Sequence, residues 1–164
     1  MPVVVADTSP INYLVQIDAI ELVPSLFGKI AISAAVNAEL THQGTPSAVR
    51  TWMAQGAQWL EIRPNPDHWN HGAMPTSLDA GERTTIELAD VIEADLILMD
   101  DRDAVAFARA QGFAVTGTLG VLDLAARQNF IDLAEAFARL KATSFHYRQG
   151  LLDTFLAQKP RPKR

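Results

Sequence analysis

Acidic residues follow two apolar runs that have the composition of buried β-strands. Asp7 comes directly after the run Val3–Ala6, and Asp100 and Asp101 follow the run Leu96–Met99. Ligand sites of open α/β sheets form where the carboxyl ends of parallel strands meet, so we expect these carboxylates at one end of a sheet. Capping of the next helix explains a single Asp at such a place, but three acids need another explanation.

Two glutamates are further candidates for the same site. Glu39 ends the small, apolar stretch 34–39, although a lone glutamate on a helix is more often exposed to solvent. Glu82 follows Asp79 at the spacing of a helix capping box, which is an equally good structural explanation of Glu82. Gly81 weakens the first turn of that helix, but its missing side chain lets a ligand or another segment approach closely.

Several carboxylates at one end of a sheet would repel one another unless a cation lay among them. Because no Cys or His accompanies them, an oxygen-only site suits the hard cations Mg²⁺ and Mn²⁺. Sites of this kind act on phosphates by orienting water and neutralising developing charge. This chemistry covers nucleases, phosphatases and phosphotransferases alike.

Short apolar segments alternate with segments of helical periodicity, and these must position the acids. The expected strands are 2–6, 29–32, 58–62, 96–99 and 113–115. The expected helices are 10–17, 20–26, 34–40, 46–54, 79–91, 104–111, 118–127, 131–140 and 147–156. Ser9 is expected to cap the first helix, and the proline-rich stretch 63–77 is expected to be a surface loop.

Fully apolar strands that alternate with helices indicate a parallel sheet covered on both faces. We therefore predict an α/β protein with a three-layer α/β/α fold. The chain has 164 residues, of which 48% are hydrophobic and 20% charged, as in one globular domain. It has no cysteine, which excludes disulfide scaffolds, Cys-based zinc sites, thiol nucleophiles and iron–sulfur clusters.

The charge of the chain is uneven. There are 19 acidic and 14 basic residues, a net charge of −5 that disfavours broad electrostatic attachment to nucleic acid. Four of the basic residues lie in the last six positions, so we predict one domain over 1–158 and a basic tail over 159–164. No apolar run approaches the roughly 18 residues of a membrane helix, and no signal-peptide pattern is found. We expect a cytoplasmic protein.

The motifs resemble those of PIN domains. Val3–Pro10 resembles the first strand and helix start of this family, where apolar residues precede Asp-Thr or Asp-Ser. Ile32–Leu40 resembles the family's second acidic element, in which a Glu closes such a segment. Three stretches resemble a bacterial and archaeal branch of PIN-like proteins: Leu78–Glu82, Leu96–Arg102 and Val115–Leu122. The order and spacing of the motifs, more than any one of them, carry the likeness.

The resemblance implies a PIN-like metal-dependent endoribonuclease related to the VapC-type toxins of toxin–antitoxin modules. Members of this family place four acids around one or two Mg²⁺ or Mn²⁺ ions and hydrolyse RNA phosphodiesters. Carried over to this chain, the metal ligands and catalytic residues are Asp7, Glu39, Glu82 and one or both of Asp100 and Asp101. The partners implied are an RNA substrate, a small antitoxin protein and a second copy in a homodimer, with no membrane.

Other residues would support or replace these ligands. Thr8, with Ser9 as the second choice, resembles the hydroxyl residue that supports the first Asp. Many PIN domains have Asp where this chain has Glu82, so Asp79 is the alternative ligand, and Asp103 is a candidate outer member.

The expected mechanism uses no covalent nucleophile. Asp7 and an acid of the pair 100–101 would hold Mg²⁺ on a phosphate oxygen, while Glu39 or Glu82 orients and helps deprotonate water. Two other functions stay open: a catalytically inactive PIN-like binding or regulatory module, and a metal-dependent small-molecule phosphatase. The segment 7–9 lacks the second Asp of Asp-x-Asp phosphatases, which disfavours the latter.

Several aromatic residues and histidines are set aside as structural. The loop residues His68 and His71 lack a third ligand and are expected to face solvent. Trp52, Trp59 and Phe137 are expected in the core or an interface and not as platforms for base stacking.

Overall fold

Five short parallel strands form the centre of the molecule. In the computed structural model, which describes residues 2–67, 69–146 and 157, the strands lie in the order β3-β2-β1-β4-β5. Their bounds are Val4–Ala6 for β1, Ile30–Ser33 for β2, Leu60–Arg63 for β3, Leu96–Leu98 for β4 and Val115–Thr116 for β5. Every pairing is parallel, so the carboxyl ends of all five strands lie at the same end of the sheet.

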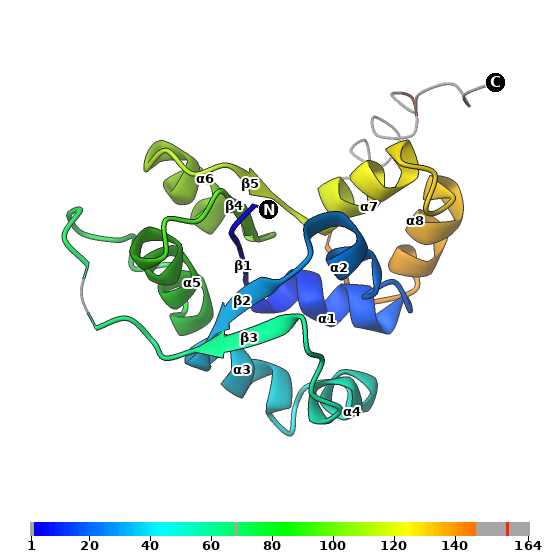
Figure 1. Ribbon diagram of the computed structural model, residues 1–164, viewed down its shortest axis with the longest axis horizontal. Coiled ribbons are helices and arrows are strands. Elements are labelled where there is room, and N and C mark those ends of the chain that lie inside the picture. The colour runs from blue at the N-terminus through cyan, green and yellow to red at the C-terminus, as the bar shows by residue number, and fades with distance from the viewer. Residues whose placement is uncertain (1, 68, 147–156, 158–164) are drawn as a thin grey trace.

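Helices cover both faces of this sheet, as the sequence predicted. The bounds are Thr8–Gln16 for α1, Leu22–Phe27 for α2, Ala34–Thr41 for α3, Ser47–Ala54 for α4, Ala80–Val91 for α5, Arg102–Ala110 for α6, Thr118–Arg127 for α7 and Leu133–Lys141 for α8. Figure 1 shows α5 and α6 on one side of the sheet and α1, α2, α7 and α8 on the opposite side, with α3 and α4 beyond β3. The three-layer α/β/α prediction is confirmed.

The two faces of the sheet belong to separate hydrophobic cores. Val5 and Ile97 pack on the side of α5, together with Ile86. Val4 and Leu98 pack on the other side, in the core formed with α1, α7 and α8. Because both faces of β1 and β4 are buried, these strands are continuous apolar runs without polar alternation. The first polar residue after each run therefore marks the carboxyl end of the sheet.

Two local predictions are wrong. The last strand is Val115–Thr116 and not 113–115, because the backbone N–H of Phe113 bonds the carbonyl of Ala108 at 3.1 Å and so closes helix α6. The first helix begins at Thr8 with Asp7 in the N-cap position. Ser9 therefore lies inside the helix, where it has another partner.

Some predictions fall on residues that the structure does not describe. The expected helix 147–156, the basic tail 159–164 and His68 lie outside the described residues. The boundary between a domain 1–158 and the tail thus stays a prediction. No helix within the described residues is long and apolar enough to cross a membrane.

Candidate active site

A cleft of about 530 Å³ opens at the carboxyl end of the sheet. All five acids that the sequence singles out line it, together with the alternative ligand Asp79. These acidic residues are Asp7, Glu39, Asp79, Glu82, Asp100 and Asp101. They come from the ends of β1 and β4 and from α3 and α5, and only the parallel topology brings these elements together. Asp103 is exposed in α6 and does not line the cleft.

Asp7 is held at the end of β1 with only 5% of its surface exposed. Its backbone N–H donates to the carbonyl of Leu98 at 2.8 Å, which ties the end of β1 to the end of β4. Asp7 occupies the N-cap position of α1, but its side chain makes no capping hydrogen bond. Helix capping therefore does not account for this buried carboxylate.

Glu39 reaches the cleft from α3 and contacts two other elements. The hydroxyl of Thr8 donates to its Oε2 atom. Thr8 was expected to support Asp7 with this hydroxyl, but the hydroxyl bonds Glu39 instead. A Cβ atom at Gly81 would lie only 2.7 Å from Oε1 of Glu39, so a glycine in the first turn of α5 leaves room for this carboxylate.

Glu82 both caps helix α5 and lines the cleft. Its backbone N–H donates to Oδ1 of Asp79 at 2.8 Å, and its Oε1 accepts from the backbone N–H of Asp79 at 3.1 Å. This capping box begins α5. The same side chain is buried in the cleft wall, so the structural role does not remove Glu82 from the candidate site.

Asp100 and Asp101 differ in how their oxygens are used. Asp100 accepts three hydrogen bonds: from the backbone N–H of Thr118 at 2.6 Å, from its hydroxyl at 2.6 Å and from the hydroxyl of Ser9 at 2.8 Å. Asp100 thus joins the N-termini of α1 and α7. Asp101 caps α6 through one oxygen, Oδ2, which accepts from the backbone N–H of Ala104 at 3.0 Å.

Burial and mutual repulsion disfavour the charged form of the acids. The pKa of Asp7 is raised well above its ordinary value by burial first and then by Asp79, Glu82 and Glu39, against the opposing backbone hydrogen bond from Thr8. Repulsion among carboxylates of this kind is what a bound cation relieves.

The same causes act on two other acids. Burial first, then the charges of Asp79, Asp101 and Glu39, raise the pKa of Glu82 from 4.5 to about 7, against one backbone hydrogen bond. Burial raises the pKa of Asp100, and hydrogen bonds from neighbouring hydroxyl and amide groups oppose it. The charge of Asp101 therefore helps to raise the pKa of Glu82, whereas hydrogen bonds from neutral donors stabilise the charged form of Asp100.

No ion pair neutralises the cleft acids within the described part of the chain. The ion pairs found there are Arg63–Glu61, His71–Asp90, Arg127–Asp123 and Arg139–Glu135. Nor are three His, Asp or Glu side chains of the described residues gathered closely enough to ligate one ion together. Mg²⁺ in proteins is held by one or two carboxylates and several waters, so carboxylates that line one cleft without a basic partner are a donor set that fits it.

A second part of the cleft lining has a different chemistry and was not predicted from the sequence. Its side chains include Tyr13 and Phe145, whose rings meet edge to face at 5.0 Å. The hydroxyl of Tyr13 lies 3.1 Å from that of Ser144, which is 131 residues away along the chain. No local pattern connects segments so far apart. Arg102 and His146 also line the cleft.

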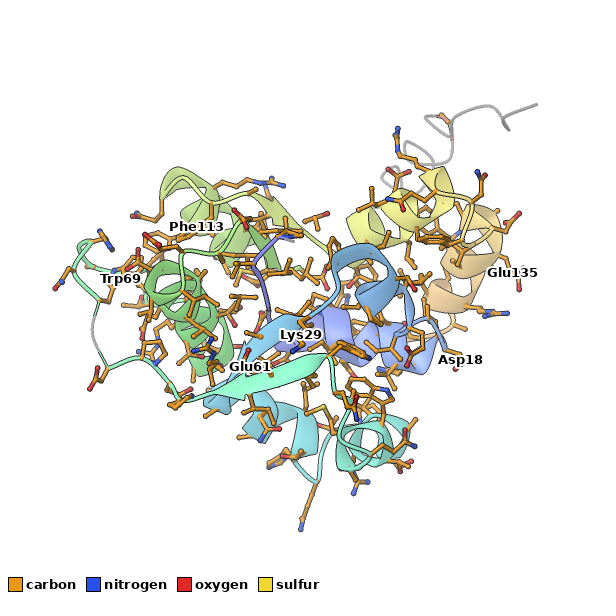
Figure 2. All side chains as sticks on the ribbon, in the orientation of Figure 1. Asp18, Lys29, Glu61, Trp69, Phe113 and Glu135 are labelled. Carbon is orange, nitrogen blue, oxygen red and sulfur yellow. The ribbon has the colours of Figure 1, made fainter. Side chains whose placement is uncertain are left out.

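Four described residues that were set aside as structural do not line the cleft: His71, Trp52, Trp59 and Phe137. Trp69 lies in the loop before α5 (Figure 2), with its ring 4.8 Å from His71 and 6.2 Å from Phe107. Trp52 and Trp59 contact each other at 5.5 Å and pack against the larger core.

The fold and the cleft together define an α/β protein with a parallel sheet whose acidic residues gather beyond the carboxyl ends of its strands. A sequence model of the PIN domain matches residues 3–159, and the chain belongs to the PIN domain family. PIN domains are a family of nucleases that are generally dependent on divalent metal ions, and membership implies binding of nucleic acid.

A similar solved structure is a PilT N-terminus domain protein from the archaeon Sulfolobus solfataricus P2. It is 15% identical in sequence, and the match covers 88% of this chain and 98% of that chain with a TM-score of 0.48. A search of curated proteins finds no match.

Proposed function

We propose that this protein is a divalent-metal-dependent endoribonuclease. One observation carries the proposal: the five acids that the sequence singles out, Asp7, Glu39, Glu82, Asp100 and Asp101, line a single cleft. Within the described residues no basic side chain is paired with them. Burying a carboxylate without a compensating positive charge costs free energy. A bound Mg²⁺ or Mn²⁺ ion would supply that charge.

The acidic side chains that line the cleft would have different roles. Asp7 and one further acid would bind the ion directly, and the other acids would reach it through water molecules. The further candidates are Glu39, Glu82 and Asp101, which uses one oxygen to cap α6. Asp100 would position the site, because its hydrogen bonds to Ser9 and Thr118 join two helices beside it. When bound, the metal ion neutralises phosphate charge and lowers the pKa of water.

Glu82 is the residue best suited to accept a proton from the attacking water. A general base works best when its pKa lies near the working pH, and in the metal-free protein the pKa of Glu82 is raised to about 7. Its capping box with Asp79 fixes the backbone from which the side chain projects. Glu39 is the second candidate for this role, since Thr8 orients its carboxylate.

Replacing Asp7 tests the proposal. Asp7→Asn should lower metal-dependent cleavage of a labelled single-stranded RNA by more than roughly 100-fold. Mutating a residue that only supports a metal ligand already lowers metal affinity or activity by roughly 10- to 100-fold. The metal-free variant should unfold at the same or a higher temperature, since a buried charge is removed. Gel analysis of the RNA and circular dichroism of the protein measure the two effects.

A matched control is Asp67→Asn, which makes the same change at an exposed residue outside the cleft. It should cleave like the parent, and both should lose activity in EDTA. Full activity of folded Asp7→Asn would contradict the assignment. Metal binding without RNA cleavage would favour an inactive binding or regulatory module, and hydrolysis of phosphomonoesters with RNA left intact would favour a phosphatase.

We extend the proposal to the biological role that the motifs imply, a toxin held in check by a small antitoxin. The support for this role is the likeness of the chain's motifs to the VapC-type branch. The homodimer and the cytoplasmic location expected from the sequence stay predictions.

A further inference from the structure

Arg102 is the one lysine or arginine among the described residues that line the acidic cleft. It is exposed and begins helix α6, directly after Asp101. Within the described part of the chain, Arg102 makes no ion pair and no side-chain hydrogen bond. An arginine beside six carboxylates that pairs with none of them calls for a physical explanation.

The two cleft acids nearest to Arg102 in the sequence already have other partners. Both oxygens of Asp100 accept hydrogen bonds from Ser9 and Thr118. Asp101 accepts from a backbone N–H inside the first turn of α6, which directs that carboxylate along its own helix. The guanidinium of Arg102 is therefore not drawn into a local salt bridge and stays available to a ligand that enters the cleft.

A nucleic-acid strand in this cleft needs such a cation. The acidic wall repels every phosphate that a metal ion does not hold, and the net charge of −5 adds to this repulsion. The wall formed by Tyr13 and Phe145 is uncharged, so it offers contacts to a nucleoside but none to a phosphate charge. Arginine is well matched to phosphate because its planar fork donates two parallel hydrogen bonds.

We propose that Arg102 binds a phosphate of the RNA strand next to the phosphate that is cleaved, and so holds the strand in register with the acids. This inference rests on the proposed ribonuclease function. It assigns to Arg102 a substrate-binding role that does not involve the chemical step. Since phosphate contacts carry no sequence information, Arg102 should contribute equally to the binding of RNAs of different sequence.

The test compares Arg102→Gln with the parent in RNA binding, in an Asp7→Asn background that prevents cleavage. Fluorescence anisotropy of labelled oligouridylate and oligoadenylate at constant Mg²⁺ across a KCl titration gives the affinity and its salt dependence. Loss of one phosphate contact should lower the slope of log K against log salt by about 0.7, the value for a single strand. Affinity for both RNAs should fall by roughly tenfold, the size of one charged hydrogen bond.

Two matched variants separate a phosphate contact from a structural role. Arg102→Lys keeps the charge and should keep the slope. Arg83→Gln makes the same change at an exposed residue of α5 that does not line the cleft, and should match the parent. In the cleavage-competent protein, Arg102→Gln should raise KM by roughly tenfold with kcat within about twofold.

Each outcome is decisive. An unchanged salt slope and KM in Arg102→Gln would overturn the inference while leaving the ribonuclease proposal intact. A slope that falls equally in Arg83→Gln would also overturn it, because the effect would then be one of overall charge. If the parent protein neither binds nor cleaves RNA, the proposed function itself fails, and the inference fails with it.

Discussion

At the scale of single residues, two glycines set how closely the cleft acids approach neighbouring elements. A Cβ atom at Gly81 would lie 2.7 and 2.9 Å from the two carboxylate oxygens of Glu39. A Cβ atom at Gly117 would lie 2.5 Å from Oδ1 of Asp100 and 3.3 Å from the backbone carbonyl of Met99. The first clash involves the end of a flexible side chain, whereas the second involves a hydrogen-bonded carboxylate and fixed backbone.

Alanine at these two positions should therefore have different consequences. Gly81→Ala should keep or raise stability, since alanine favours the helix by about 1 kcal/mol, but it displaces Glu39 and should lower RNA cleavage by roughly tenfold or more. Gly117→Ala should lower the free energy of unfolding by about 1–3 kcal/mol through overpacking. Urea denaturation and the cleavage assay measure both, and equal destabilisation by the two variants would contradict this account.

At the scale of elements, the helix ends show where the chain tolerates strain. Helices α1, α5 and α7 are followed by Asp18, Glu93 and Asn129, which have φ values of 60°, 54° and 61°. Asp18 is seen in Figure 2 at the end of α1. After α5, the backbone N–H of Ala94 bonds the carbonyl of Ala89 at 2.8 Å, as in a Schellman motif. Glycine is the favoured residue in this left-handed position, and glutamate is not.

Glu93→Gly should therefore stabilise the protein. A residue with a Cβ atom is strained in the left-handed conformation, and glycine removes this strain. The removal outweighs the greater conformational freedom of glycine in the unfolded chain, so the free energy of unfolding should rise by about 1 kcal/mol. In a domain of this size, that gain raises the thermal midpoint by roughly 2–4 °C. Glu93→Ala is the matched control, because it removes the carboxylate but keeps the Cβ atom. An equal gain from alanine would mean that charge and not backbone conformation is the cause.

At the scale of the whole molecule, the cleft acids couple folding to pH. The pKa values of Asp7, Glu82 and Asp100 are all raised in the folded protein. Between the ordinary pKa of Glu82, 4.5, and its raised value of about 7, the folded chain binds more protons than the unfolded chain. Stability therefore falls as the pH rises through this window and is highest at its acid end.

The metal-free protein should be more stable in mild acid than in mild base. In EDTA, its thermal midpoint should fall by at least roughly 3 °C between about pH 5 and about pH 8. Glu82→Gln should flatten this dependence, and because glutamine also serves in a capping box, the helix start is kept. Added Mn²⁺ should stabilise the protein more at the higher pH, because ligands must be deprotonated to bind it.

These measurements use differential scanning fluorimetry with and without metal. A metal-free protein that gains stability from about pH 5 to about pH 8 would contradict the claim that folding raises the pKa values of the cleft acids. An unchanged pH dependence in Glu82→Gln would remove Glu82 from the coupled group. Both results concern the acids alone and do not depend on any ribonuclease activity.

The alternation of apolar runs with helical periodicity determined the layered fold from the sequence alone. It also placed Asp7 and Asp100 at the same end of the sheet, because a strand buried on both faces is apolar until it leaves the core. Polarity and periodicity are local properties of the chain, and they can be recognised without knowledge of any contact. The capping box of Glu82 could be predicted for the same reason.

Only the tertiary structure decided how the side chains of the cleft are partnered. The sequence favoured Ser9 as a helix cap, yet its hydroxyl bonds Asp100, which is 91 residues away. Thr8 bonds Glu39 across 31 residues, and the wall of Tyr13 and Phe145 forms where the segment after α8 meets α1. Such partners depend on how distant segments cross, which local propensity does not encode. The acids themselves could therefore be identified from the sequence, whereas their hydrogen-bond partners are decided by the fold.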